Sequence, residues 1–264
     1  MSLDWSNSAH APVVVAVIQA RMGSTRLPGK VLMPIEGAPL LAWTVGGVRA
    51  IPGVSSVVLA TTTEPADDAV AALAGDLGVH VHRGSTHDVL ARCADAIAPF
   101  GPDVVVRQTA DNPFPDPSVA EGQVRALLDG DLDYIGIDAW PLGIAAEACR
   151  STALAVANRE ATDPADREHV LPFLYRQPDR FRIGSASRAG SAPPADRARY
   201  TVDTEADLAF ARALAARLGH GPPVTLAELE AIIEGEPELL SLNEGVAQTS
   251  WQTAQLAKET RWTS

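Results

Sequence analysis

The sequence of 264 residues has few cysteines, few aromatic residues and no excess of positive charge. Its two cysteines, Cys93 and Cys149, lie far apart and outside any metal-binding spacing, so we expect reduced thiols rather than a disulfide framework or a zinc site. The formal net charge is -12 and the isoelectric point is about 4.9. Nonspecific binding to nucleic acid needs a broad positive field, so the composition argues against a nucleic-acid surface.

Long apolar runs are also missing. No run reaches the roughly 18 residues of a membrane-spanning helix, and the N-terminal stretch has neither the basic start nor the apolar core of a secretion signal. We therefore expect a cytoplasmic protein that does not contact a membrane. Residues 1–12 are expected to be a disordered leader and residues 247–264 a tail. They flank one domain over residues 13–246, with an insertion at about 139–198.

Apolar runs and helical patterns alternate along the first half of the chain. Strands are expected at 13–20, 56–60, 79–82, 103–107 and 134–137, and helices at 39–49, 66–77, 86–98 and 117–128. Four consecutive steps from strand to helix require right-handed crossovers and a mainly parallel sheet. The pattern therefore predicts an α/β fold.

The second half of the chain is less regular. The expected elements are a strand antiparallel to the others at 143–149, helices at 151–161, 205–218 and 225–234, a helix at 164–176 that bends near Pro172, and strands at 181–185 and 199–202. This half is expected to build an insertion over the sheet edge and then to return to the sheet.

A basic stretch follows the first expected strand, and positions 5–35 hold no acidic residue. In open parallel sheets, ligands bind at the carboxyl ends of the strands. Glycine brings backbone amides close to a phosphate, while arginine offers a planar fork and lysine a point charge. The candidate anion-binding residues in the string ARMGSTRLPGK are Arg21, Gly23, Ser24, Arg26 and Lys30.

The spacing of this loop excludes the phosphate loop of nucleoside triphosphatases. That motif needs four residues between its glycines and Ser or Thr after its lysine. Here five residues separate Gly23 from Gly29, and Val31 follows Lys30. Pro28 also removes an amide donor from the loop. We interpret the stretch as a different anion loop, and the alternative is a solvated surface loop.

Two aspartates are candidate metal ligands. Asp111 follows the strand expected at 103–107, and Asp203 ends the one expected at 199–202. Two carboxylates from separate strand ends suit magnesium, which binds one or two of them together with phosphate oxygens and water. The spacing alone also allows Asp111 to form a turn and Asp203 to cap a helix.

A series of strings carries a resemblance to a known family. In chain order they are IQARMGSTRLPGKVL, ATTTEPADD, HRGSTHDVLARC, VVRQTADNPFPDP, ATDPADREHVLPFLY, YTVDTEADL and EPELLSLNEGV. Together they resemble the sugar-activating cytidylyltransferases, namely the spore coat polysaccharide biosynthesis protein F family and its relatives, the CMP-Kdo and CMP-sialic acid synthetases. The resemblance implies a Rossmann-like sheet of mixed, mostly parallel direction flanked by helices, and a possible homodimer.

The resemblance also implies a reaction. It is the magnesium-dependent transfer of CMP from CTP to a sugar, sugar acid or similar small acceptor in polysaccharide or glycoconjugate biosynthesis, with release of pyrophosphate. Asp111 and Asp203 would hold Mg²⁺, while Arg21 and Lys30 would counter the phosphate charge. The other implied positions are Ala20, Gly23, Ser24, Arg26, Thr61, Arg83 and Asp88 for the nucleotide, and Glu147, Arg167, Glu168 and His169 for the acceptor.

Two departures from the family pattern leave the acceptor open. Relatives carry G-L-D-V-E where this chain has GIAAE at 143–147, so Ala145 replaces a carboxylate. The usual glycine before the metal-binding aspartate is Ala110. The alternatives are the same fold with another nucleotide or a non-sugar acceptor, and a non-catalytic nucleotide-binding partner.

Overall fold

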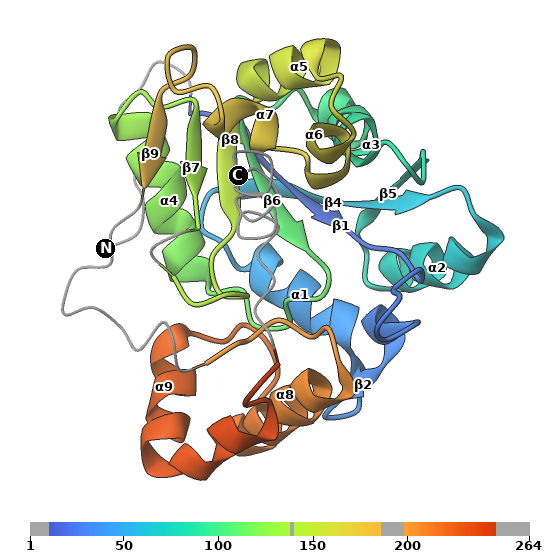
Figure 1. Ribbon diagram of the computed structural model, residues 1–264, viewed down its shortest axis with the longest axis vertical. Helices are drawn as coiled ribbons and strands as arrows, with labels where there is room; N and C mark the ends of the chain where they lie inside the picture. Colours follow the sequence, from blue (N-terminus) through green and yellow to red (C-terminus); the bar gives the residue numbers. More distant parts are fainter. Residues whose placement is uncertain (1–10, 138–139, 186–197, 247–264) are drawn as a thin grey trace, which may run out of the picture.

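The structure, a computed structural model, describes residues 11–137, 140–185 and 198–246 (Figure 1). The main sheet of this part consists of β1 (Val14–Gln19), β4 (Val54–Thr62), β5 (His80–Gly84), β6 (Val104–Thr109), β7 (Tyr134–Gly136), β8 (Glu147–Arg150) and β9 (Ile183–Ser185). Its strand order is β5-β4-β1-β6-β8-β7-β9. A short ribbon pairs β2 (Pro34–Ile35) with β3 (Ala38–Pro39). The expected C-terminal tail and nearly all of the expected leader lie outside the described residues.

The strand directions confirm the prediction of a mixed, mostly parallel sheet. β1 pairs in parallel with β4 and β6, and β4 pairs in parallel with β5. β8 is antiparallel to β6 and to β7, and it lies between them inside the sheet. The antiparallel strand starts at Glu147 rather than at 143, because the positive φ of Gly143 interrupts an extended chain.

Helices cover both faces of the sheet. Their bounds are α1 (Leu40–Arg49), α2 (Asp68–Asp76), α3 (Val89–Ile97), α4 (Pro117–Asp129), α5 (Ser151–Glu160), α6 (Pro164–His169), α7 (Pro172–Tyr175), α8 (Glu205–Leu218) and α9 (Leu226–Gly235). The helices expected in the first half and at 151–161, 205–218 and 225–234 are all present. Their ends differ from the expected ones by only a few residues.

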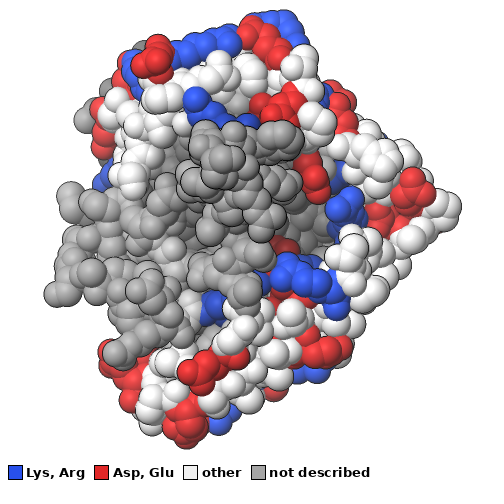
Figure 2. Space-filling model, in the orientation of Figure 1, with Lys and Arg blue, Asp and Glu red and all other residues white. Residues whose placement is uncertain are grey.

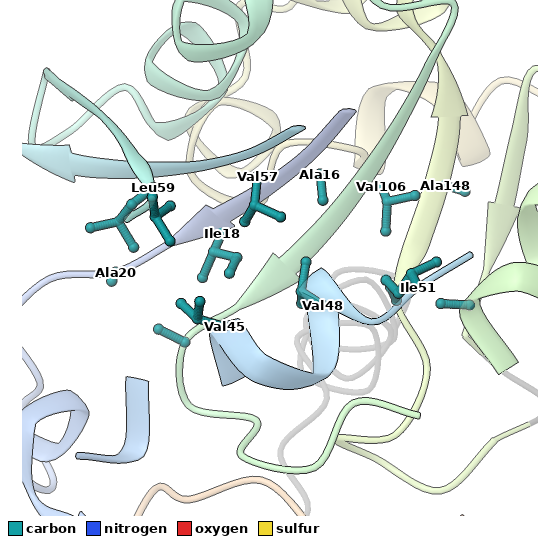
Figure 3. Packing of buried hydrophobic residues seen from close by; sticks show 14 of the residues in the cluster. Ala16, Ile18, Ala20, Val45, Val48, Ile51, Val57, Leu59, Val106 and Ala148 are labelled. Atoms are coloured by element: carbon teal, nitrogen blue, oxygen red, sulfur yellow. The ribbon is translucent and has the colours of Figure 1, made fainter. Parts of the chain in front are cut away.

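β1 is buried on both faces, as a central parallel strand should be. Ala16 and Ile18 pack on one side with Val45 and Val48 of α1 (Figure 3). Val17, on the other side, packs in a second cluster with residues of α3 and α5. This two-sided packing fixes β1 in the sheet and thus fixes where the following loop begins.

The C-terminal helices form a third cluster beside α1. It contains Leu208 and Phe210 of α8 together with Trp43 and Phe114, whose rings meet edge to face with centroids 5.7 Å apart. The Trp43 indole donates a hydrogen bond to the carbonyl of Ile35 at 2.9 Å, so its polar atom is satisfied inside the cluster. This packing holds α8, and the residues just before it, against the sheet domain.

Two expected elements are wrong. Residues 199–202 form no strand, because Tyr200 donates its amide hydrogen bond to Leu142 and Val202 donates to Asp111, so no ladder forms. The single bent helix expected at 164–176 is two helices, α6 and α7. Val170 between them has a φ of 76°, which is outside the helical range.

The surface agrees with the composition. On the face shown in Figure 2, acidic and basic residues are interspersed and the described part shows no broad basic area. Among the described helices, none combines the length and the apolar character needed to cross a membrane.

Gly143 provides a test of this packing. Its φ is 100°, and a Cβ atom there would lie 2.7 Å from the backbone carbon of Tyr200. We expect Gly143→Ala to lower the free energy of unfolding by about 1–3 kcal/mol, because both the backbone conformation and the close contact would be strained. Urea denaturation measures this change.

The control is Gly122→Ala in the middle of α4, where an added Cβ meets no atom of the described residues within 4 Å. It should raise the free energy of unfolding by about 0.5–1 kcal/mol, since alanine loses less backbone freedom than glycine. Equal effects of the two substitutions would contradict the close approach of the two chain segments.

Candidate active site

The site lies where the carboxyl ends of β1 and β6 meet. The chain crosses from β1 to β4 on one side and later returns to β6 on the other, which makes this the switch point of the sheet. A cleft of about 390 Å³, here called the loop cleft, opens at this point. The predicted site residues that line it are Ala20, Arg21, Gly23, Ser24, Arg26, Lys30, Asp111, Glu168, His169 and Asp203.

The loop after β1 is folded by its own hydrogen bonds. The Gly29 amide donates to the carbonyl of Met22 at 3.1 Å, and the Leu27 amide donates to Ser24 Oγ at 3.3 Å. Gly29 has a φ of 73°, which turns the chain so that Lys30 faces the end of the sheet. The Ser24 amide donates to Met22 inside the loop, and is therefore engaged within the protein.

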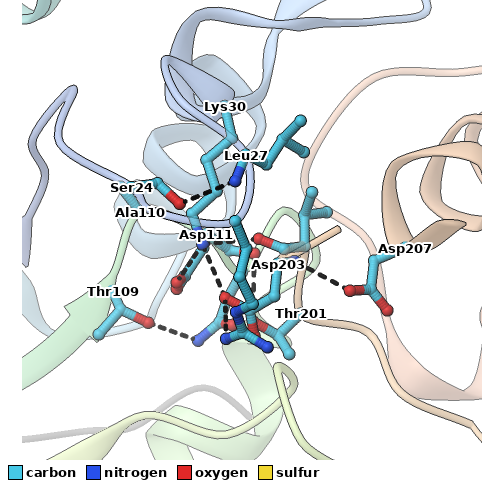
Figure 4. Close-up of polar contacts among 12 residues, drawn as sticks. Ser24, Leu27, Lys30, Thr109, Ala110, Asp111, Thr201, Asp203 and Asp207 are labelled. Atoms are coloured by element: carbon cyan, nitrogen blue, oxygen red, sulfur yellow. Dashed lines mark hydrogen bonds and ion pairs between the residues drawn. The ribbon is translucent and has the colours of Figure 1, made fainter. Parts of the chain in front are cut away.

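Lys30 joins both candidate metal ligands. Its Nζ lies 2.9 Å from Asp111 Oδ2 and 2.9 Å from Asp203 Oδ1, and it donates to the carbonyl of Val202 at 2.7 Å (Figure 4). The residue is only 8% exposed. One ammonium group thus connects the loop after β1, the turn after β6 and the segment before α8.

Asp203 is held from several sides. Arg26 lies 3.0 Å from its Oδ1, and Arg199 forms an ion pair with its Oδ2. Its backbone amide donates to Asp207 at 3.0 Å. Asp207 also completes the capping box with Thr204 at the start of α8. The helix cap therefore positions the carboxylate.

The charges of this cluster shift its pKa values. Burial by itself would lower the pKa of Lys30, but the carboxylates of Asp111 and Asp203 raise it above its ordinary value. Burial would raise the pKa of Asp203, but Lys30, Arg199 and Arg26 together lower it below its ordinary value. Both groups are charged at neutral pH.

Asp111 and Asp203 fit a divalent cation of the magnesium type. Their oxygens converge on one positively charged group, so they are already arranged around a cation. Two carboxylates are a sufficient protein contribution, because magnesium completes its octahedron with phosphate oxygens and water. Among the described residues, no group of three or more His, Cys, Asp and Glu forms a metal cage.

A second cleft adjoins the first. This cleft, here called the sheet cleft, has a volume of about 270 Å³ and is lined by residues of β6, β7 and β8. It shares Asp111, Asp203 and His169 with the loop cleft. The two carboxylates thus stand at the boundary between two binding spaces.

Arg107 and Glu147 form the main ion pair of the sheet cleft. They face each other across β6 and β8, and Tyr134 donates from its hydroxyl to Glu147 at 2.7 Å. Burial would lower the pKa of Arg107, but Glu147 raises it above its ordinary value. His169 lines both clefts, and burial lowers its pKa, so its imidazole is neutral near pH 7.

Comparison with known proteins identifies the fold family. The cytidylyltransferase family model matches residues 15–245. The chain belongs to the cytidylyltransferase family. It is 35% identical over 233 residues to the spore coat polysaccharide biosynthesis protein SpsF of Bacillus subtilis, covering 85% of this chain and 95% of that protein. The family prediction from the sequence strings is therefore confirmed.

Solved structures agree with this assignment. A cytidylyltransferase from Leptospira borgpetersenii superposes with a TM-score of 0.79 at 26% identity, covering 86% of this chain and 96% of that one. The CMP:2-keto-3-deoxy-manno-octonic acid synthetase, solved with CTP, has a TM-score of 0.59 at 21% identity over 78% of this chain and 99% of its own, and supports the fold. The predicted homodimer and cytoplasmic location stay predictions.

Some predicted positions of this cytidylyltransferase lie outside both clefts. Asp88 caps α3 and forms an ion pair with Arg167. Arg83 binds Asp68 and the carbonyl of Thr62. Thr61 is fully buried in β4. These four predicted residues, Thr61, Arg83, Asp88 and Arg167, do not line either cleft. The side chains of Arg83, Asp88 and Arg167 bind neighbouring segments instead.

Arg92 lines the loop cleft and was missed by the sequence analysis. It is 2% exposed and its Nη1 donates to the carbonyl of Ser85, while its buried Nε has no hydrogen-bond partner among the described residues. Burial lowers the pKa of Arg92, and the charge of Arg21 acts in the same direction. A signal was present, because helical spacing puts Arg92 on the apolar face with Val89 and Ala96.

The shifted pKa values predict a pH profile. The charge of Asp203 contributes to the free energy of unfolding. This contribution is complete above the pKa that an aspartate has in the unfolded chain, about 3.9, and it is lost as the pH falls through the lowered pKa of Asp203 in the folded protein. The contribution of the Lys30 charge to the free energy of unfolding is complete below about pH 10.4, the pKa of lysine in the unfolded chain. It is lost as the pH rises through the raised pKa of Lys30 in the folded protein.

Urea denaturation from pH 2 to 7 measures the acid side of this profile. Asp203→Asn should lose less stability on acidification than the wild type, because it has no charge left to neutralise at that position. Asp95→Asn, at an exposed position of α3, is the control, and its free energy of unfolding should change with pH as steeply as that of the wild type. Identical slopes for Asp203→Asn and the wild type would contradict the stabilising role of the Asp203 charge.

Proposed function

We propose that this protein transfers CMP from CTP to a hydroxyl group of a small sugar-like acceptor and releases pyrophosphate. The observation that carries the proposal is the meeting of the cationic loop with Asp111 and Asp203 between two adjoining clefts. Membership of the cytidylyltransferase family supports the reaction type, and the likeness to SpsF supports a role in polysaccharide biosynthesis.

The loop cleft takes the nucleotide in this proposal. Lys30 and Arg26 already contact carboxylates, whereas Arg21 and Arg92 have no carboxylate within 4 Å among the described residues. Asp67 and Asp88, which act on Arg92 from farther away, are engaged by Thr62 and Arg167 respectively. Arg21 and Arg92 therefore offer the unmatched positive charge that a triphosphate needs.

The sheet cleft takes the acceptor. The hydroxyl oxygen of the acceptor attacks the α-phosphorus of CTP. A new bond forms between this oxygen and the α-phosphorus, and the bond between the α-phosphorus and the pyrophosphate group breaks. His169, which lines both clefts, receives the hydroxyl proton in this proposal, because its imidazole is neutral near pH 7. Lys30, Arg21 and Arg92 counter the charge of the departing pyrophosphate, so positioning and fixed charges supply most of the catalysis.

Asp111 and Asp203 are the residues that would hold the metal ion, which we propose to be magnesium. When bound, such an ion neutralises phosphate charge and orients the phosphate oxygens. The carboxylates keep their places through protein contacts of their own. Asp111 accepts the Val202 amide on its backbone carbonyl at 2.8 Å, and Asp203 is fixed by the cap of α8.

The nucleotide assignment is tested by thermal denaturation with each of the four nucleoside triphosphates and magnesium. CTP should raise Tm the most, by several degrees, since a ligand at about 100 times its Kd adds about 2.7 kcal/mol. Equal shifts with all four nucleotides would reject the preference for cytosine. No shift with any of them would reject the nucleotide site itself.

Arg92 gives a second prediction. Arg92→Met should weaken CTP binding at least about tenfold, equivalent to about 1.4 kcal/mol, while binding of cytidine stays unchanged. The unliganded variant should be at least as stable as the wild type, because an apolar side chain replaces a buried charge that no carboxylate of the described residues adjoins. Titration calorimetry and thermal denaturation measure the two effects.

The control for Arg92 is Arg125→Met, which removes an exposed arginine of α4 paired with Glu121. It should leave CTP binding as in the wild type. If Arg92→Met loses stability without ligand and still binds CTP normally, Arg92 is structural and its assignment to the triphosphate is wrong.

A further inference from the structure

We infer that the acceptor is an uncharged polyhydroxylated molecule, a sugar or polyol without a carboxylate or phosphate group. The inference rests on the proposed function, since it takes the sheet cleft as the acceptor site. It goes further because it excludes the sugar acids, one class of acceptor that the sequence left open.

The first observation is that all three guanidinium nitrogens of Arg107 donate hydrogen bonds within the protein. Its Nη1 donates to Glu147, and its Nε and Nη2 donate to Gln19 Oε1 at 3.1 and 2.8 Å. The side chains of Arg107 and Glu147 are only 12% and 15% exposed. An acceptor carboxylate would have to displace Glu147 and leave its charge buried and unpaired, which is costly.

The other arginine of the cleft is engaged in the same way. Arg199 forms an ion pair with Asp203, and its Nε lies 3.2 Å from Asp207 Oδ1. Its side chain is 8% exposed. Among the described residues, every arginine that lines the sheet cleft is therefore matched by a carboxylate.

The two clefts differ in charge, because the arginines of the sheet cleft are paired with carboxylates. Asp111 and Asp203 line both clefts, and each cleft has one further carboxylate, Glu168 in the loop cleft and Glu147 in the sheet cleft. The loop cleft also contains Arg21 and Arg92, which have no carboxylate within 4 Å among the described residues, whereas the arginines of the sheet cleft are already paired. An anionic acceptor would meet these carboxylates without a free cation to offset them. An uncharged acceptor avoids this repulsion.

The second observation concerns hydrogen bonding. Gln108 is 3% exposed and lines the sheet cleft, and within the described part of the chain its buried Nε2 has no hydrogen-bond partner. Its Oε1 accepts from Asn112 Nδ2 at 3.5 Å, which leaves the amide nitrogen as the donor. A buried donor without a partner is unfavourable, so the cleft is suited to a ligand that supplies an oxygen there.

Neutral side chains complete the lining. Thr109 and Thr201 provide hydroxyl groups, and Ile137, Leu142 and Ala145 provide apolar surface. Hydroxyl and amide groups both donate and accept, which matches a sugar hydroxyl. The methyl group of Ala145 belongs to this apolar surface. The volume of about 270 Å³ suits one small molecule.

The test is a pyrophosphate-release screen with CTP and magnesium over matched sets of acceptors. Each set contains an uncharged pentose, hexose, heptose or polyol, the corresponding acid and the corresponding phosphate. We expect at least one uncharged member to react, and its acid and phosphate to have kcat/KM lower by at least about tenfold, equivalent to about 1.4 kcal/mol. Preferential turnover of an acid or a phosphate, or no turnover of any uncharged member, overturns the inference.

Two variants examine the physical cause. Glu147→Gln removes the carboxylate that pairs with Arg107. It should raise the ratio of kcat/KM for an acid to kcat/KM for its uncharged counterpart at least about tenfold, equivalent to about 1.4 kcal/mol. Glu121→Gln, on α4 and away from both clefts, should leave the ratio unchanged. An unchanged ratio in Glu147→Gln contradicts the role given to this ion pair.

Gln108→Met tests the hydrogen-bond donor independently. It should raise KM for the uncharged acceptor and leave the thermal stabilisation by CTP as in the wild type. Normal KM in this variant contradicts the contact from Gln108. Thermal denaturation with CTP on the same preparations distinguishes the two proposals. If CTP does not raise Tm, the proposed function is rejected. If CTP raises Tm normally and an acidic acceptor is turned over preferentially, only this inference is rejected.

Discussion

The contact of the Lys30 ammonium group with Asp111 and Asp203 is the interaction on which the site depends. It joins three segments that are far apart in the sequence and that the fold positions separately. Packing of β1 fixes the start of the loop, the sheet fixes Asp111 after β6, and the capping box of α8 fixes Asp203. The boundary between the two clefts therefore rests on the rigid parts of the fold.

This arrangement leaves some groups in an unfavourable state. In the part of the chain that the structure describes, Arg92 is buried without an adjacent carboxylate, and the Gln108 amide nitrogen is buried without a hydrogen-bond partner. Most buried polar groups in proteins are satisfied, so such exceptions need an explanation. Each of these two lines one of the clefts, and a bound ligand supplies the missing contact in our account. The same reasoning separates the clefts by charge into a nucleotide side and an acceptor side.

Much of the fold could be predicted from the sequence because local patterns determine it. Apolar runs predicted the strands of the first half, and the pattern at 205–218 predicted α8 with the bounds that the structure shows. The segment 199–202 was predicted wrongly as a strand, because its hydrogen bonds go to Leu142 and Asp111, contacts that depend on the tertiary fold.

The site was predictable where a motif carries the chemistry. The loop after β1, Asp111 and Asp203 do come together, whereas Asp88 and Arg167 bind each other outside the clefts. Pairing of this kind depends on helices α3 and α6, which touch only in the folded chain. The same limit applies to Arg199, whose contact with Asp203 requires the extended segment before α8.

The most direct test of the account is the binding of Mn²⁺, as a spectroscopic substitute for magnesium, to the CTP-loaded protein, followed by electron paramagnetic resonance. Asp111→Asn and Asp203→Asn should each weaken Mn²⁺ binding at least about tenfold, equivalent to about 1.4 kcal/mol. Asp68→Asn, an exposed carboxylate paired with Arg83, should bind Mn²⁺ like the wild type. Wild-type Mn²⁺ binding in both Asp111→Asn and Asp203→Asn, with the fold intact by circular dichroism, would contradict the placing of the reaction centre between these carboxylates.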